Sequence, residues 1–266
     1  MNEKKHSRPT RRKSVIYILP YTAAPRRPGF LLFPLPDITM EPLSPQVMHK
    51  LVFTILVHGL PESQNALALD VLAESQNNPN VQVREMAVVA ISELPVPAAK
   101  RVHLLGRSMK DTAPRVRRRA ARALGDFGPN ALAVLPSLIA GLRDLDVSVR
   151  RDCAGAIGRL GAPAQAGAAN LVALLGEPDV RTRVVAAESL KRLGRAALSP
   201  LLEGLHSRDP EIRGRCATII GYIAPDDVNV SEALRTALYD THEDVRRRAG
   251  DALDAICIPL SELVTA

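Results

Sequence analysis

Apolar residues recur along most of this chain with the spacing of an α-helix. The clearest helix carries apolar residues at offsets 0, 4, 8 and 11: Val116, Ala120, Leu124 and Phe127. Because an α-helix makes one turn about every 3.6 residues, this spacing places all four residues on one face. A second apolar run, residues 131–142, follows before the pattern returns. The pattern therefore predicts helices that come in pairs.

The helix pairs form a repeat. An arginine marks the same place in each copy, and successive arginines are 33, 33, 33, 30 and 33 residues apart: Arg84, Arg117, Arg150, Arg183, Arg213 and Arg246. Glycine and proline lie at the junctions, as in Gly128-Pro129, where they are typical of helix ends and helix starts. A period of this length indicates an α-solenoid, in which each helix pair buries its apolar face against its neighbours.

The two ends of the array differ from its middle. Residues 62–74 are predicted to form the first helix of the faintest copy, and residues 45–57 a helix that caps the array. No obvious closing cap follows the last copy, which would leave apolar surface for a partner or a second copy. The expected parts are a basic disordered arm, a cap with the first helix, the repeats and a C-terminal tail: residues 1–40, 41–77, 78–257 and 258–266.

Composition agrees with helices packed on helices. Hydrophobic residues make up 46% of the chain, whereas aromatic residues make up only 3% and tryptophan is absent. The net charge of +7 is concentrated at the N-terminus, where residues 1–40 carry eight bases and two acids. The remaining residues carry 27 bases and 26 acids, a net of +1. The predicted folded part is therefore close to neutral as a whole.

The repeats resemble a known family. Segments such as DTAPRVRRRAARALGDFG from Asp111 and DLDVSVRRDCAGAIGRLG from Asp144 are similar to the HEAT-like repeats of phycobilisome bilin lyases. The resemblance runs from about Asn78 to Cys257 and implies an all-α, right-handed α-solenoid of about six helix pairs behind an N-terminal capping helix. The family includes scaffolds, bilin-chaperoning lyase subunits, DNA glycosylases of related build and di-iron hydroxylases of deoxyhypusine, so its fold does not fix a function.

The resemblance also implies a structural role for the repeated acids and arginines. In such repeats an acid six residues before the arginine commonly forms a ladder that links adjacent layers. Asp111 with Arg117, Asp144 with Arg150 and Asp240 with Arg246 fit this role, and Arg183 and Arg213 occupy the same place in their repeats. Asn78 and Ser207 depart from the acid.

The catalytic members of the family require residues that are scarce here. A di-iron site needs several His-Glu pairs, and the chain has only His242-Glu243. A glycosylase needs aromatic surfaces for an extruded base, but the repeats offer only Phe127, Tyr222 and Tyr239. We therefore expect no metal, no cofactor and binding rather than catalysis.

The cellular location is expected to be a bacterial cytoplasm. Cys153, Cys216 and Cys257 are an odd number, and the first two lie two repeats apart, too far for a disulfide. No apolar run is long enough to span a membrane.

The expected binding surface is the concave face formed by the second helix of each pair. Its basic candidates are Arg118, Arg119, Arg122, Arg151, Arg192, Arg215, Arg247 and Arg248, and Arg159 and Lys191 are expected on the same face. Interspersed acids such as Asp126 and Asp152 leave open a face that is merely solvated. The sequence favours a scaffold or adaptor for a protein partner, with an acidic partner as one expectation. A bilin-chaperoning subunit, weak nucleic-acid binding and any oligomeric state remain open.

Overall fold

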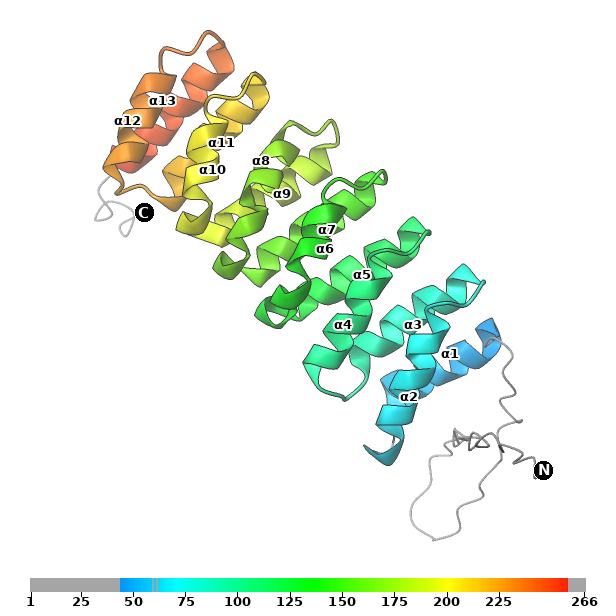
Figure 1. Ribbon diagram of the computed structural model, residues 1–266. Coiled ribbons are helices and arrows are strands. Elements are labelled where there is room, and N and C mark those ends of the chain that lie inside the picture. The colour runs from blue at the N-terminus through cyan, green and yellow to red at the C-terminus, as the bar shows by residue number, and fades with distance from the viewer. Residues whose placement is uncertain (1–43, 59, 61, 258–266) are drawn as a thin grey trace, which may run out of the picture. The chain divides into compact units, whose positions relative to one another are not determined.

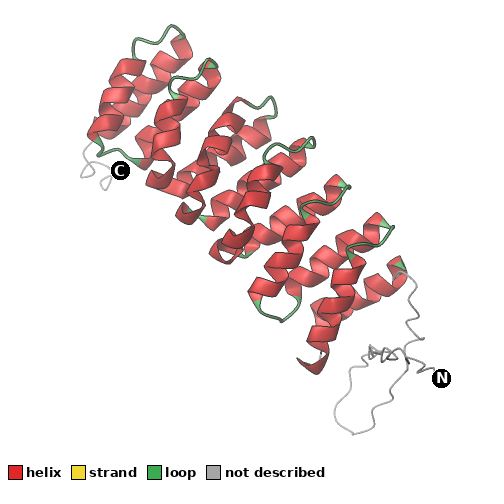
Figure 2. Cartoon of the chain, in the orientation of Figure 1, coloured by secondary structure: helices red, strands yellow, loops and turns green. Residues whose placement is uncertain are grey.

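The computed structural model describes residues 44–58, 60 and 62–257, and every regular element among them is a helix (Figure 2). The chain divides into two compact units, the first ending at Pro95 and the second beginning at Val96. The predicted all-helical repeat fold is confirmed. The predicted arm at 1–40 and tail at 258–266 lie outside the described residues.

The first unit contains α1 (Pro45–Phe53), a π-helical turn η1 (Thr54–His58), α2 (Glu62–Ser75) and α3 (Val81–Glu93). The Oγ of Ser44 caps α1 and the side chain of Asn80 caps α3, so each helix begins where its first free N–H groups find an acceptor. Both α1 and α2 pack against α3. The helix predicted at 45–57 therefore exists, although its last turn widens into η1.

The second unit consists of successive helix pairs (Figure 1). The first helices are α4 (Ala98–Ser108), α6 (Leu135–Gly141), α8 (Ala168–Ala173), α10 (Leu198–Gly204) and α12 (Val228–Ala237). The second helices are α5 (Pro114–Asp126), α7 (Val147–Leu160), α9 (Val180–Leu193), α11 (Pro210–Ile223) and α13 (Glu243–Cys257).

Short 3-10 turns connect several of these helices. They are η2 (Gly128–Val134), η3 (Ala162–Gly167), η4 (Leu174–Gly176) and η5 (Gly194–Ala197). Gly161 and Gly194, which end α7 and α9, have φ angles of 75° and 60°, a left-handed conformation that favours glycine. Glycines at the junctions after α5, α7 and α9 thus turn the chain into the next pair, whereas the C-cap of α11 is Ala224.

Glycine also sets how closely the second helices approach one another. A Cβ on Gly158 of α7 would lie 2.6 Å from the Oγ of Ser189 and 2.8 Å from its Cα on α9. Gly221 of α11 meets Ala252 of α13 in the same way, at 2.9 Å. The equivalent residue of α9 is Lys191, and α9 packs against α11 far less extensively than against α7. A long side chain at this position therefore coincides with a looser step in the stack.

The last described helix closes the stack with a polar surface. Val245, Ala249 and Ala252 of α13 are buried. Its exposed residues are mostly charged: Glu243, Arg246, Arg247, Asp251 and Asp254. Because α13 covers α11 with one face and shows charges on the other, it already has the character of a terminal repeat.

The cysteines of the repeats are core residues. Cys153 and Cys216 are free and fully buried, and a Cβ on Gly141 or Gly204 would lie within 2.5 Å of their sulfur atoms. Burial raises the pKa of Cys216 to about 12 and raises that of Cys153 further. Both side chains therefore remain thiols that fill space between the two helices of a pair.

None of the described helices combines the length and the apolar character needed to cross a lipid bilayer.

Candidate functional site

The repeated arginines link neighbouring repeats. Nε and Nη2 of Arg117 donate to the two carboxylate oxygens of Asp144 at 2.6 and 2.7 Å. Its Nη1 donates to the backbone carbonyls of Asp111 and Thr112 at 2.7 and 3.0 Å. Arg117 thus contacts the backbone of Asp111 in its own repeat and the carboxylate of Asp144 in the following repeat. The acid–arginine ion pair runs between repeats, not within one.

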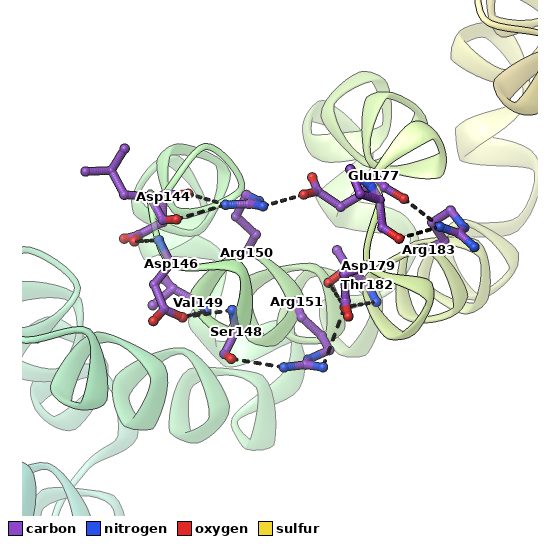
Figure 3. Close-up of polar contacts among 12 residues, drawn as sticks. Asp144, Asp146, Ser148, Val149, Arg150, Arg151, Glu177, Asp179, Thr182 and Arg183 are labelled. Atoms are coloured by element: carbon purple, nitrogen blue, oxygen red, sulfur yellow. Dashed lines mark hydrogen bonds and ion pairs between the residues drawn. The ribbon is translucent and has the colours of Figure 1, made fainter.

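The same contact recurs along the second unit. Arg213 holds Asp240 at 2.7 and 2.8 Å, and Arg150 pairs with Glu177 (Figure 3). Arg246 donates to the carbonyls of Asp240 and Thr241, like the other anchors. We call these contacts between an anchor arginine and the acid of the next repeat the ladder.

Two of the ladder acids, Asp144 and Asp240, are held ionised. Burial opposes the charge of Asp144, but hydrogen bonds from Arg117 and from the backbone N–H of Asp146 outweigh it and lower its pKa. The hydrogen bond from Arg213 likewise lowers the pKa of Asp240. The ladder therefore consists of charged hydrogen bonds, which are stronger than neutral ones.

One contact of the ladder is missing. Nη1 of Arg183 donates to the carbonyls of Glu177 and Pro178, both at 2.8 Å (Figure 3). The next repeat has Ser207 where the other repeats of the second unit have an acid, and within the described residues no carboxylate pairs with Arg183. The missing contact coincides with the single 30-residue interval and with the loose step between α9 and α11.

An open groove of about 810 Å³ lies over α5, α7 and α9. Its lining consists of five arginines, two aspartates, three valines and a glycine: Arg118, Arg122, Asp126, Arg151, Asp152, Gly155, Arg159, Val180, Arg181, Val184 and Val185. The charged side chains of the lining leave a net charge of +3. This groove is the candidate binding site of the second unit.

The arginines of the groove are held in place by few acids. Asp152 of α7 is shared by two arginines of α5, at 3.2 Å from Nε of Arg118 and 3.0 Å from Nε of Arg122. Arg151 donates to the Oγ of Ser148 at 3.0 Å and lies 3.6 Å from Asp179 (Figure 3). Each guanidinium has more donors than these contacts use.

Arg159 depends on a glycine for its position. Its guanidinium lies across α5, where a Cβ on Gly125 would come within 2.2 Å of Nη2. From there it donates to the carbonyl of Arg122 at 3.4 Å and lies 3.7 Å from Asp126. The absence of a side chain at Gly125 therefore allows Arg159 to reach the neighbouring helix.

The apolar part of the groove comes from α9. Val180 and Val184 lie one turn apart, with 60% and 56% of their surfaces exposed. Val185 lies behind them, 3.5 Å from the position of a Cβ on Gly155. The groove thus has a cationic side on α5 and α7 and an aliphatic side on α9.

Only part of the predicted basic surface meets at this groove. Arg118, Arg122, Arg151 and Arg159 line it, whereas Arg119 and Arg192 are exposed outside its lining.

Three further candidate arginines make contacts within the fold. Arg215 donates to the carbonyl of Leu175 at 3.1 Å and pairs with Glu211, and Asp244 holds both Arg247 and Arg248. In this structure these arginines stabilise their own helices or link them to neighbouring segments.

Among the arginines of the lining, only Arg181 was not singled out from the sequence. Arg181 has no consistent counterpart, since the equivalent residues of other repeats are Arg115, Ser148, Glu211 and Asp244. Comparison of equivalent repeat positions therefore does not single out Arg181. Only its closeness to Val184 along the same helix hints at a shared surface.

Charge is distributed unevenly along the repeats. Residues 41–95 hold two bases and six acids, a net of −4, whereas residues 96–266 hold 25 bases and 20 acids, a net of +5. The division at Pro95 is also the division between the two compact units. The near-neutral total for residues 41–266 therefore hides a basic second unit that contains the groove.

Groups that could hold a metal ion or stack on a base are scarce among the described residues. The part of the chain that the structure describes contains no group of three or more His, Cys, Asp or Glu residues able to hold a metal ion. Phe127 is half-buried with the Arg101 guanidinium 4.6 Å from its ring centre, and Tyr222 is exposed beside Lys191. None of the aromatic residues of the second unit lines the groove.

Comparison with known proteins places these features in context. A family model described as HEAT repeats matches residues 67–139 and 135–207. No curated protein matches the sequence significantly.

Similar solved structures include Escherichia coli YibA, at 16% identity and a TM-score of 0.47, covering 80% of this chain and 88% of that one. An archaeal HEAT-like repeats protein from Thermococcus onnurineus NA1 has 16% identity and a TM-score of 0.43, covering 81% and 98%. A designed armadillo repeat protein has 18% identity and a TM-score of 0.43, covering 71% and 99%.

Proposed function

This chain belongs to the HEAT repeat family, whose stacked helices commonly bind proteins, and we propose that it is a scaffold or adaptor that binds a protein partner through the groove over α5, α7 and α9. The proposal gives the partner-binding role to Arg118, Arg122 and Arg151 among the candidates predicted from the sequence. It assigns the ladder residues a purely structural role.

The observation that carries this proposal is the composition of the groove. Arginine is enriched at the centres of protein interfaces, where its planar guanidinium can donate several hydrogen bonds and its stem packs on apolar groups. Here five arginines meet two exposed valines on neighbouring helices. Such a surface offers a partner both charged hydrogen bonds and apolar burial.

The groove is also partly ordered before a partner binds. Asp152 restrains Arg118 and Arg122, and Gly125 together with the Arg122 carbonyl positions Arg159. Binding loses less conformational entropy when side chains are already restrained. This pre-ordering favours a binding surface over a randomly solvated face.

A bilin-chaperoning subunit is the second candidate, following the resemblance to phycobilisome lyase repeats. The propionates of a tetrapyrrole would match the arginines, and its ring system would cover Val180 and Val184. The test is a titration with biliverdin. A shift of its visible absorption with the wild type, lost when Arg122 and Arg151 are changed to Glu, would favour this candidate over the protein adaptor.

The adaptor proposal is tested by pull-down from a lysate of the source organism, with mass spectrometry of the retained proteins. The groove variant combines Arg118→Glu, Arg122→Glu and Arg151→Glu. The control variant combines Arg143→Glu, Arg208→Glu and Arg235→Glu, which alters three exposed arginines outside the second helices by the same total charge.

We expect a protein that the wild type and the control retain and the groove variant loses. Purified, that protein should bind the wild type directly in calorimetry. Circular dichroism and melting temperatures must match among the three chains. If the groove variant retains the same proteins as the wild type, the groove is not the binding site.

A further inference from the structure

The groove has a chemistry specific enough to describe what it binds. We propose that it takes an acidic peptide segment of a partner protein, with carboxylates between the arginines of α5 and α7 and one aliphatic side chain against Val180 and Val184 of α9. This inference rests on the proposed function and deepens it.

Charge complementarity favours an acidic segment. The lining has a net charge of +3, and a single carboxylate, Asp152, serves both Arg118 and Arg122. Arg181 has no ion pair within the described residues. Additional carboxylates would therefore meet unused donors, and planar guanidinium groups bind carboxylates in a bidentate manner.

The aliphatic side of the groove favours a peptide that also carries an apolar side chain. Val180 and Val184 are more than half exposed, although β-branched side chains on a soluble protein gain free energy from burial. Gly155 leaves the adjacent part of the α7 surface without a side chain. A leucine, isoleucine or valine of the partner would cover the two valines beside Gly155.

The lining favours a peptide over a nucleic acid. Asp126 and Asp152 would repel a phosphate backbone, and the lining contains no aromatic side chain on which a base could stack. The N-terminal sequence of the same chain is also a poor occupant. Residues 1–40 carry eight bases and two acids, so their net charge has the same sign as the groove.

The position of the two sides defines the expected motif. The arginines of α7 and the valines of α9 belong to adjacent helices, whose axes in packed pairs lie about 8–10 Å apart, and the arginines of α5 lie one helix further away. An extended peptide covers that distance in about three residues. The segment should therefore carry Asp or Glu about two to four residues from an aliphatic residue.

The test starts with an unbiased selection. The full chain is immobilised and presented with a phage library of random peptides of about 12 residues, which span at most about 40 Å. Enriched peptides are synthesised, labelled and measured by fluorescence anisotropy. We expect the enriched sequences to share acids close to an aliphatic residue. A selection that enriches no peptide, or only neutral or basic ones, would overturn the inference.

Variants then locate the binding site. We expect Arg122→Gln, Arg151→Gln and Arg181→Gln together to weaken binding by about a hundredfold, and Val180→Ser with Val184→Ser by about tenfold. The matched control, Arg143→Gln with Arg208→Gln and Arg235→Gln, should bind like the wild type. Replacing the aliphatic residue of the peptide by serine should weaken binding to the wild type, but have little effect on binding to the valine variant.

The outcomes separate this inference from the proposed function. Acidic peptides that bind the wild type and the groove variant equally would place their site elsewhere and overturn the inference. Binding of a single-stranded DNA of about 20 nucleotides, lost in the groove variant, would overturn it in favour of a nucleic acid. In either case, a protein that the pull-down captures through the groove would still support the adaptor proposal. If no such protein is captured, the adaptor proposal is wrong, whatever the peptide result.

Discussion

Each ladder arginine joins two repeats with one side chain. Nη1 of Arg117 donates to the carbonyls that precede its own helix, while Nε and Nη2 donate to the carboxylate of Asp144 in the next repeat. The planar guanidinium carries donors in these directions at once, which the ammonium of lysine cannot do. The repeated arginine therefore fixes both the loop of one repeat and its register with the next.

This dual contact predicts unequal losses from removing different anchors. Arg117→Ala leaves the half-buried Asp144 without its cation and should lower the free energy of unfolding by about 3 kcal/mol. Arg183→Ala removes only hydrogen bonds to two carbonyls and should cost about 1 kcal/mol. Urea unfolding followed by circular dichroism measures both. Equal losses would show that the carboxylate contact adds nothing to stability.

The ladder acids predict a loss of stability in acid. The pKa of Asp240 is lowered by its hydrogen bond from Arg213, and that of Asp144 is lowered despite burial. The folded chain thus holds these protons more weakly than the unfolded chain. The resulting stabilisation is present above the ordinary aspartate pKa near 4, and is lost as pH falls through the lowered value.

The measurement is the urea midpoint between about pH 6 and pH 2.5. The wild type should lose stability over this range, and Asp240→Asn should start lower and depend less on pH. Asp254→Asn, an exposed aspartate later in α13, serves as the control and should follow the wild type. An unchanged pH dependence in Asp240→Asn would contradict the role given to Arg213.

At this scale, spacing marked the repeated arginines, and the family resemblance suggested that the acids before them take part in a ladder. Neither gave the carboxylate partner of each arginine, because Arg117 and Asp144 are 27 residues apart and meet only through the stacking of helices. The sequence also placed Arg159 on the basic face, but not what holds it there, since its position depends on Gly125 of another helix.

Contact between second helices depends on small residues at one position. Gly158 of α7 accommodates the backbone of Ser189 on α9, so these helices lie closer than larger side chains would allow. Gly155 on the same helix is different, because a Cβ there would meet its nearest neighbours at 3.5 and 3.6 Å, ordinary contact distances.

Two substitutions to alanine within α7 should therefore have opposite effects. Gly158→Ala forces α7 and α9 apart and should destabilise the chain by about 2 kcal/mol. Gly155→Ala fits without strain and should stabilise it by about 1 kcal/mol, because alanine favours a helix more than glycine does. Melting temperatures of the two variants provide the measurement. A stabilising Gly158→Ala would show that the helices are not in close contact there.

Helix positions were largely predictable from apolar periodicity. The predicted helix at 62–74 corresponds to α2 at Glu62–Ser75. The 3-10 turns before α6, α8 and α10 were not predicted, because their apolar residues continue the pattern of the helices that follow. Neither was the groove, which requires three helices far apart in sequence to lie side by side.

Along the whole chain, residues 41–95 carry a net negative charge and the second unit carries a net positive one. The field of the second unit extends over roughly a Debye length, about 8 Å at physiological salt. It should therefore raise the local concentration of acidic segments near the groove, whichever partner carries them.

The missing ladder contact has a consequence for how the second unit unfolds. Repeat proteins behave as chains of units coupled to their nearest neighbours, and the weakest coupling decides where cooperativity breaks. Between α9 and α11 the stack lacks both the ion pair and the close glycine contact, and Arg195 bridges this interval only through exposed pairs with Asp226 and Asp227. Exposed pairs add little free energy.

Hydrogen exchange should therefore show the amides of α11 and α13 opening together in mild denaturant while α5, α7 and α9 remain protected. A single opening event for all five helices would contradict this expectation. If two blocks open independently, the C-terminal block can melt and refold while the groove keeps its shape. The binding surface would then be insulated from fluctuations, or from damage, at that end of the chain.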